Sequence, residues 1–205
     1  MALSTETDRQ SSFKQRVKQE RELEILQAAR EVFAERGFAK ASIDDIAERV
    51  GIGKGTVYLH FASKEDILVA AMRLACQTLV DKCRKQALAQ PTTVGKLQAA
   101  LRVLVDHRYA NERLVRAIST ELPHFLAEKQ RVTAISDLRE LLTELVVQGQ
   151  VEGAFNPQLD PQLAALSLLS LVFVAASHLE SIAKEQLVQS LERLYFHGIT
   201  QEVKS

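Results

Sequence analysis

The chain carries SIDDIAERVGIGKGTVYLHF at residues 42–61, and this segment predicts two short helices joined by a tight turn. Ser42 precedes the first helix, and Asp45 stands three residues later, as in a capping box. Gly51 follows that helix and can adopt the left-handed conformation that ends it. The pattern is that of a helix-turn-helix, although a small bundle of three helices shows the same spacing.

The flanking segments predict one helix before this motif and a long helix after it. Val17–Arg36 carries apolar residues at helical spacing and is followed by a glycine, so it is the expected first helix. Residues 1–15 before it are polar, and we expect a flexible basic arm there. The third helix is expected within Lys54–Phe61, and the fourth from Lys64, after a second serine cap, to about residue 89.

The rest of the chain predicts an all-α protein with two domains. Further helices are expected at residues 93–108, 112–122, 129–148, 161–183 and 184–200, with a loop at 149–160. A helix-turn-helix domain is predicted at 16–66, and a second, helical domain at 67–205. No linker is expected between them, because the fourth helix passes from one to the other.

The composition limits the class of protein. Apolar residues make up 46% of the chain and aromatic residues 5%, and the formal net charge is zero, so any contact with nucleic acid must come from a local patch. The N-terminus lacks the apolar region of a signal peptide, and the apolar stretch at 163–176 is shorter than the about 20 residues that span a bilayer. We therefore expect a cytoplasmic protein with no membrane partner. Cys76 and Cys83 are expected to be free thiols, with a redox sensor as the alternative.

Two runs of residues are similar to a known family. These are GFAKASIDDIA at 37–47 and VGIGKGTVYLHFASKEDIL at 50–68. Residues 20–70 closely resemble the DNA-binding domain of the tetracycline-repressor (TetR) family of bacterial transcriptional regulators. The resemblance implies a homodimer that binds double-stranded operator DNA and is released by a small-molecule effector. The sequence leaves activation open as an alternative to repression.

The resemblance also implies which residues contact DNA: Ser42, Lys54, Gly55, Thr56, Tyr58, His60 and Lys64. Gly55 would let the backbone approach the duplex, and Thr56 would reach a base edge or a phosphate. The side chains at the other family-matched positions, Ser42, Tyr58, His60 and Lys64, would meet phosphates. The family often has serine where this chain has Gly53, so the cap that a serine would supply is absent here.

The last two predicted helices are candidates for the dimer interface. The helix from Pro161 is apolar almost all round, which indicates burial on two sides. In the TetR family such helices form a four-helix interface between subunits. The expected interface residues are Leu163, Leu166, Ser170, Leu171, Val174, Leu187, Leu191 and Leu194. The alternative is that both helices only complete the core of a monomer.

The effector pocket is expected among the helices between residues 64 and 148. Its candidate lining residues are Met72, Cys76, Leu79, His107, Tyr109, His124 and Phe125. The alternative for each of them is an ordinary packing or surface role. We expect an apolar or amphipathic effector, no cofactor, and no metal, because the histidines are not paired with cysteine or acidic residues at ligand spacing.

No pattern typical of an enzyme stands out. The chain has no glycine-rich phosphate loop, no nucleophile elbow and no HExxH motif. We therefore expect a ligand-responsive DNA-binding regulator and no enzyme. The alternative is a helical ligand-binding or interaction module with a vestigial helix-turn-helix, which the intact run at 54–64 disfavours.

Overall fold

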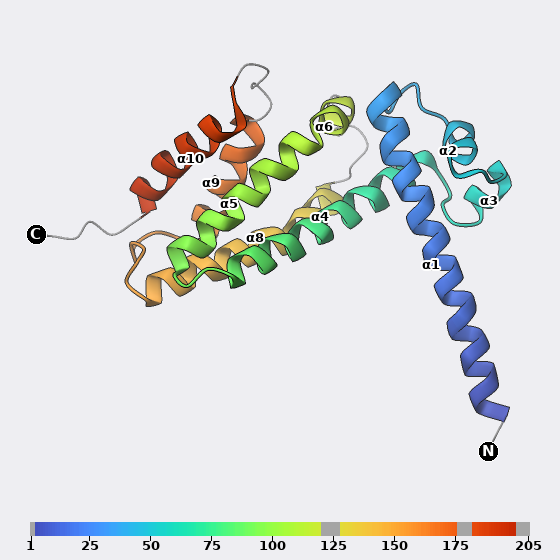
Figure 1. Cartoon of the computed structure of the whole chain (residues 1–205), viewed down its shortest axis with the longest axis horizontal. Coiled ribbons are helices and arrows are strands. Elements are labelled where there is room, and N and C mark those ends of the chain that lie inside the picture. The colour runs from blue at the N-terminus through green and yellow to red at the C-terminus, as the bar shows by residue number, and fades with distance from the viewer. Residues whose placement is uncertain (1–2, 120–127, 176–181, 200–205) are drawn as a thin grey trace, which may run out of the picture. The chain divides into compact units, whose positions relative to one another are not determined.

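The computed structural model describes residues 3–119, 128–175 and 182–199, and every regular element in these ranges is a helix (Figure 1). The helices are α1 (Leu3–Arg36), α2 (Ile43–Val50), α3 (Lys54–Tyr58), α4 (Lys64–Leu88), α5 (Thr93–Ala110), α6 (Glu112–Ser119), α8 (Glu128–Val151), α9 (Pro161–Ala175) and α10 (Lys184–Ile199). The all-α prediction is confirmed. No helix within the described ranges is both long and apolar enough to cross a membrane.

The chain divides into two compact units, and the boundary lies inside α4. The first unit extends to Met72 and includes the end of α6 from Ala117, and the second takes Arg73–Arg116 and the C-terminal part. The boundary predicted after residue 66 lies in the same helix and stays a prediction. Ile67, Leu68 and Ala71 of α4 are buried and belong to the first unit.

In the first unit, α1, α2, α3 and the start of α4 share one apolar core. Its most deeply buried side chains are Ile25, Ala29, Val32, Phe33, Phe38, Ile46, Val57 and Ile67. The rings of Phe33 and Phe38 pack at 5.2 Å between centroids. Burial of these aromatic and aliphatic groups fixes the angle between α2 and α3, since Ile46 and Val57 meet the same core.

The ends of α2 agree with the sequence prediction. The Ser42 side chain accepts a hydrogen bond from the backbone N–H of Asp45, and the Asp45 carboxylate accepts one from the backbone N–H of Ser42, which completes the capping box. Gly51 ends α2 with φ 77°, the left-handed region that a side chain disfavours. Gly53 precedes α3 and offers no side-chain cap, as expected for glycine at that position.

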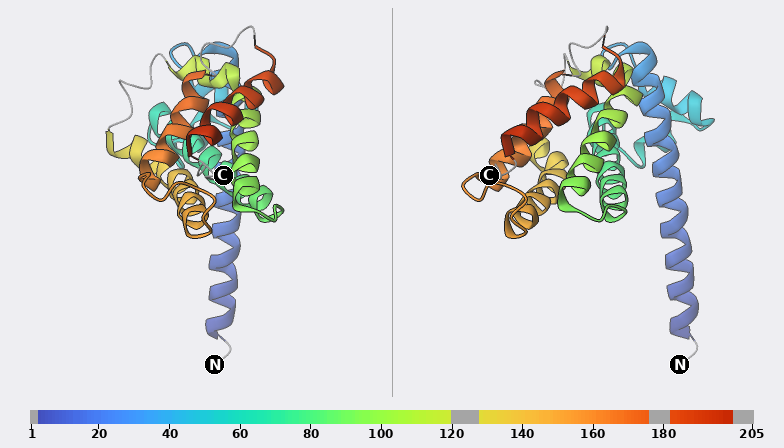
Figure 2. Two further views of the ribbon diagram at one scale, coloured as in Figure 1. Left: turned by 90° about the vertical axis from the view of Figure 1, so that its left-hand side faces the viewer. Right: turned by 60° about the vertical axis from the view of Figure 1, so that its left-hand side comes forward.

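The first helix is longer than predicted. α1 begins at Leu3, so the residues that were expected to form a flexible arm are helical. No glycine or proline interrupts the chain between residues 3 and 36, so nothing in this stretch ends the helix. Both views of Figure 2 show the N-terminal half of α1 standing clear of α2 and α3.

The second unit packs α5, α8, α9 and α10 around an aliphatic core that includes Leu97, Leu101, Leu142, Leu168 and Leu191. The loop after α8 closes on this core. The Phe155 ring is fully buried and lies over Gly149, where a Cβ would stand only 2.1 Å from a ring carbon. Glycine is therefore required at residue 149 by close packing.

The two predicted C-terminal helices correspond to α9 and α10. α9 begins with the Asp160 cap, which accepts a hydrogen bond from the Leu163 backbone at 2.7 Å, and it is described as far as Ala175. Leu187 and Leu191 of α10 are buried in the core of their own chain, and the interface role predicted for them stays a prediction. They fill that core because α10 lies against α5 and α9.

The remaining predicted interface residues divide into three groups. Leu163, Leu166, Ser170 and Leu194 are exposed. Leu171 is half-buried and packs against the core. The side chain of Val174 lies outside the described residues.

Candidate nucleic-acid interface

Four of the predicted DNA-binding residues lie together on α3. Lys54, Gly55 and Tyr58 are exposed, and Thr56 is half-buried. The Tyr58 side chain is 49% exposed, which is unusual for a large aromatic residue. Val57 is the fully buried residue of this helix and holds it on the core. The side of α3 opposite Val57 is therefore exposed.

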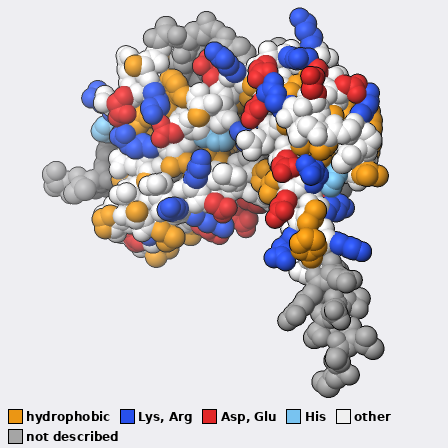
Figure 3. Space-filling view, turned by 45° about the vertical axis from the view of Figure 1, so that its right-hand side comes forward, with side chains coloured by type: hydrophobic (Ala, Val, Ile, Leu, Met, Phe, Trp, Pro, Cys, Tyr) orange, Lys and Arg blue, Asp and Glu red, His pale blue; other side chains and the backbone are white. Residues whose placement is uncertain are grey.

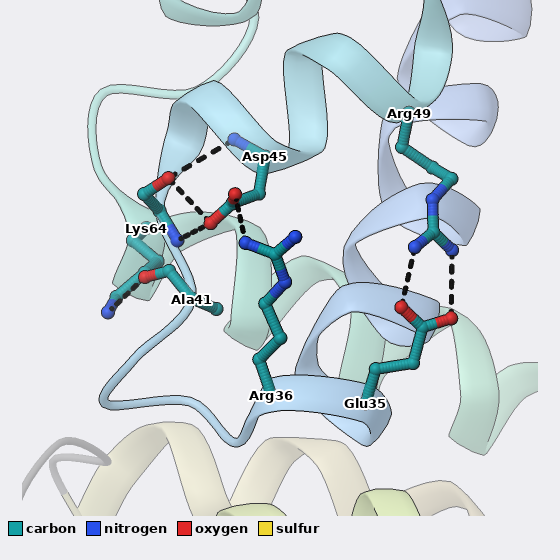
Figure 4. Close-up of polar contacts among 7 residues, drawn as sticks. Glu35, Arg36, Ala41, Asp45, Arg49 and Lys64 are labelled. Atoms are coloured by element: carbon teal, nitrogen blue, oxygen red, sulfur yellow. Dashed lines mark hydrogen bonds and ion pairs between the residues drawn. The ribbon is translucent and has the colours of Figure 1, made fainter.

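A polar network fixes the start of α2, and it uses the donors of Ser42 (Figure 4). The Ser42 hydroxyl donates to Asp45 Oδ2 at 2.7 Å, and its backbone N–H donates to the same oxygen at 2.9 Å. Arg36 of α1 donates to the other oxygen of Asp45. Hydrogen bonds from the side chain and backbone of Ser42, with the charge of Arg36, hold the pKa of Asp45 below its usual value.

A second ion pair joins α2 to α1, and the sequence analysis did not single it out. Arg49 donates to Glu35 at 3.1 and 2.6 Å (Figure 4). It also donates to Glu31 at 3.0 Å. The hydrogen bond from Arg49 lowers the pKa of Glu35. These groups are largely exposed, so the pairs that join α2 to α1 add little to stability.

Lys64 has a different environment from the one that the family resemblance implies. Its ammonium group donates to the carbonyl oxygens of Phe38 at 2.7 Å and Ala41 at 2.9 Å, with Ala39 at 3.5 Å. It also lies 4.3 Å from the centroid of the Phe38 ring. The ammonium therefore satisfies carbonyl groups of the loop between α1 and α2 instead of facing solvent.

His60 and Lys54 also have partners within the chain. His60 Nδ1 lies 3.3 Å from Glu22 Oε1, and the His60 side chain is only 11% exposed. Lys54 Nζ lies 2.7 Å from Asp44 Oδ2 on the surface, and Asp44 raises the pKa of Lys54. The first contact joins the end of α3 to α1, and the second neutralises an acidic group beside α3.

The predicted pocket residues do not form one described site. Leu79 belongs to the core of the second unit, and Met72 lies in the first unit. The Tyr109 hydroxyl donates to the backbone of Ile182 at 3.1 Å. Cys76 and His107 are half-buried. His124 and Phe125 lie outside the described residues.

The two cysteines are free, as expected. Burial raises the pKa of the Cys83 thiol to about 12 and also raises the pKa of Cys76. Because the thiolate is the reactive form, these environments disfavour the redox alternative.

The sequence matches two family models. The model of bacterial regulatory proteins of the tetR family matches residues 25–71, and a tetracyclin repressor-like C-terminal domain model matches residues 90–177. The repressor KstR2 of Rhodococcus jostii is 30% identical over 159 residues, which cover 76% of this chain and 78% of that protein. The chain belongs to the TetR family. It is a ligand-responsive helix-turn-helix transcriptional repressor and not an enzyme.

Solved structures of TetR proteins share the fold. The fatty acid degradation regulator FadR of Bacillus halodurans superposes with a TM-score of 0.74 at 27% identity, covering 85% of this chain and 97% of that one. FadR of Bacillus subtilis, solved in complex with stearoyl-CoA, has a TM-score of 0.78 at 22% identity, covering 86% of this chain and 98% of that one. The tertiary structure of this TetR chain therefore follows that of its relatives.

The contacts of Lys64 predict the effect of its removal. We expect Lys64→Met to lower the free energy of unfolding by about 1–3 kcal/mol, because buried carbonyl groups lose a charged donor. Operator binding should weaken while its salt dependence stays unchanged. Urea unfolding and DNA titrations at several salt concentrations measure both effects.

Lys85→Met is the matched control, because Lys85 is an exposed residue of the same helix. It should leave stability and DNA binding unchanged. A fall of about 0.9 per subunit in the salt slope of Lys64→Met would instead assign the ammonium to a phosphate.

Proposed function

We propose that this repressor reads operator DNA with the exposed side of α3, through Lys54, Thr56 and Tyr58. The supporting observation is that these polar groups lie on one short helix whose other side is anchored by Val57. Lys54 is paired with Asp44 at the exposed surface, where water can replace the contact, whereas Ser42, His60 and Lys64 have partly buried partners within the chain. We assign these three residues to orienting α2 and α3. Their role is then to fix the geometry of the reading helix.

Gly55 supports the same proposal. A Cβ built at Gly55 would meet no other atom within 4 Å, so no contact inside the protein requires glycine there. Glycine within a helix costs about 0.5–1 kcal/mol relative to alanine. We infer that glycine is required at residue 55 by the DNA, because the missing side chain lets the backbone approach the duplex.

We further propose that α9 forms the subunit interface. Its outward side presents Leu163, Leu166, Ser167, Ser170 and Phe173, a continuous apolar and small-residue surface without a charge. Leu194 of α10 is also apolar and is 69% exposed. Two copies would bury it and hold two copies of α3 at the spacing of successive major grooves, about 34–36 Å.

For the effector we propose an acyl-CoA thioester with a long apolar acyl group. A relative at 27% identity regulates fatty acid degradation, and FadR of Bacillus subtilis, which shares the fold, was solved in complex with stearoyl-CoA. The aliphatic side chains of α4, α5 and α8 suit an acyl chain better than a polar ligand. Binding in the second unit would favour a form with the reading helices wrongly spaced for the operator.

The hydroxyl of Tyr58 tests the reading helix. We expect Tyr58→Phe to weaken binding to the DNA upstream of its own gene by about 1–2 kcal/mol, through loss of a hydrogen bond to a phosphate. Fluorescence anisotropy measures the affinity. Tyr109→Phe, which also removes one exposed hydroxyl, should bind normally. Equal affinities for wild type and Tyr58→Phe would remove Tyr58 from the DNA contacts.

The interface is tested by Leu166→Glu. A charge on the outward side of α9 should yield a folded monomer that loses operator affinity, because one reading helix contacts only one half-site. Light scattering and a DNA titration measure the two effects. Leu88→Glu, at an 82% exposed leucine of α4, should remain dimeric. A Leu166→Glu protein that stays dimeric would place the interface elsewhere.

The effector class is tested with stearoyl-CoA. We expect it to raise the melting temperature and to release the upstream DNA, because a ligand stabilises the state that it binds. Free CoA is the control for the nucleotide part, and stearate is the control for the acyl chain. If stearoyl-CoA has no more effect than these two, the thioester proposal fails while DNA binding still stands.

A further inference from the structure

The N-terminal part of α1 concentrates positive charge in a chain whose formal net charge is zero. Residues 12–21 contain four basic residues, Lys14, Arg16, Lys18 and Arg21, and the single acidic residue Glu20. Every residue from 12 to 20 is exposed. Figure 3 shows the basic side chains gathered on this part of the helix. The segment is helical and makes no contribution to the core, so its conformation needs another explanation.

Two of these lysines lie on the side of α1 that faces the end of α3. Lys14, Lys18 and Glu22 are spaced four residues apart, so they share one side of the helix. Glu22 Oε1 lies 3.9 Å from Lys18 Nζ and 3.3 Å from His60 Nδ1. His60 follows α3 directly, after Leu59. The row of side chains therefore begins beside the reading helix and leads away from it.

We propose that Lys14 and Lys18, the α1 basic face, bind the phosphate backbone of duplex DNA beside the bases that α3 reads. This inference rests on the proposed function of α3. At 1.5 Å per residue, Lys18 and Lys14 lie about 6 and 12 Å beyond Glu22 along α1. A duplex presents a phosphate charge about every 1.7 Å along its axis, so both ammonium groups meet phosphates without a sequence requirement.

The ion pairs and the exposure of these basic side chains fit this role. Lys14 has no ion-pair partner among the described residues, and Lys18 is 63% exposed with a long contact to Glu22. An exposed pair of this kind is weak, so Lys18 can exchange it for a phosphate. Arg21 is engaged with Glu24 at 2.6 Å. Arg16 stands two residues from each lysine and so lies on the opposite side of the helix.

The test compares charge removal on the two sides of α1 in the full chain. Lys14→Gln/Lys18→Gln removes the α1 basic face, and Arg16→Gln removes a charge of the same sign from the other side. Binding to two probes is titrated at several salt concentrations: a random-sequence 40-bp duplex and the DNA upstream of the gene. Circular dichroism checks that each variant keeps its helical content.

We expect the double variant to bind both duplexes at least tenfold more weakly at moderate salt. Its salt slope should fall by about 1.8 per subunit, since each phosphate contact contributes about 0.9. Arg16→Gln should keep the wild-type slope. The random duplex separates this inference from the proposed operator function, because a wild type that prefers no sequence would refute only the latter.

Three outcomes would overturn the inference. An unchanged slope in the double variant would show that the lysines meet no phosphate. An equal loss in Arg16→Gln would show a diffuse charge effect in place of a face. Binding of the wild type to phosphatidylglycerol vesicles that the double variant loses, with DNA binding unchanged, would assign the face to a membrane surface.

Discussion

The DNA-binding unit depends on the ammonium group of Lys64, which satisfies the carbonyl groups of the loop between α1 and α2. Buried backbone oxygens need a donor, and a loop cannot supply one through regular helical bonding. Lys64 is the first residue of α4, so one side chain joins the start of that helix to the residues just before Ser42. This contact holds the loop that leads into the cap of α2, while the buried Ile46 and Val57 fix the angle between α2 and α3.

Acidic residues around α2 are neutralised within the unit. Asp44 is paired with Lys54, Asp45 with Arg36, and Glu31 and Glu35 with Arg49. Each exposed pair adds little to stability, yet together they reduce the negative potential that would repel a phosphate backbone. In a chain of zero net charge, attraction to DNA then depends on where the remaining basic groups stand. The row from Lys18 to Lys14 provides such groups next to the reading helix.

In the second unit, the two sides of α9 have different surroundings. One side, with Ala165, Leu168 and Val172, is buried in the core, and the other side is apolar but exposed. α10 contributes Leu187 and Leu191 to the same core and leaves Leu194 outside. A helix with two apolar sides is stable in water only when a second surface covers the outer one. This requirement connects the packing of one chain to its proposed assembly.

Local chemistry determined the helix ends, because a cap acts within a few residues of itself. Ser42 with Asp45, Gly51 and Asp160 could be assigned from sequence, and the family resemblance predicted that α3 is the reading helix. Only the tertiary structure decided the partners of His60 and Lys64 and the buried side of α10. Helical spacing reveals an apolar stripe without showing which neighbour covers it. The partner of a long charged side chain likewise depends on which distant segment folds against it, as the carbonyls of Phe38 and Ala41 do for Lys64.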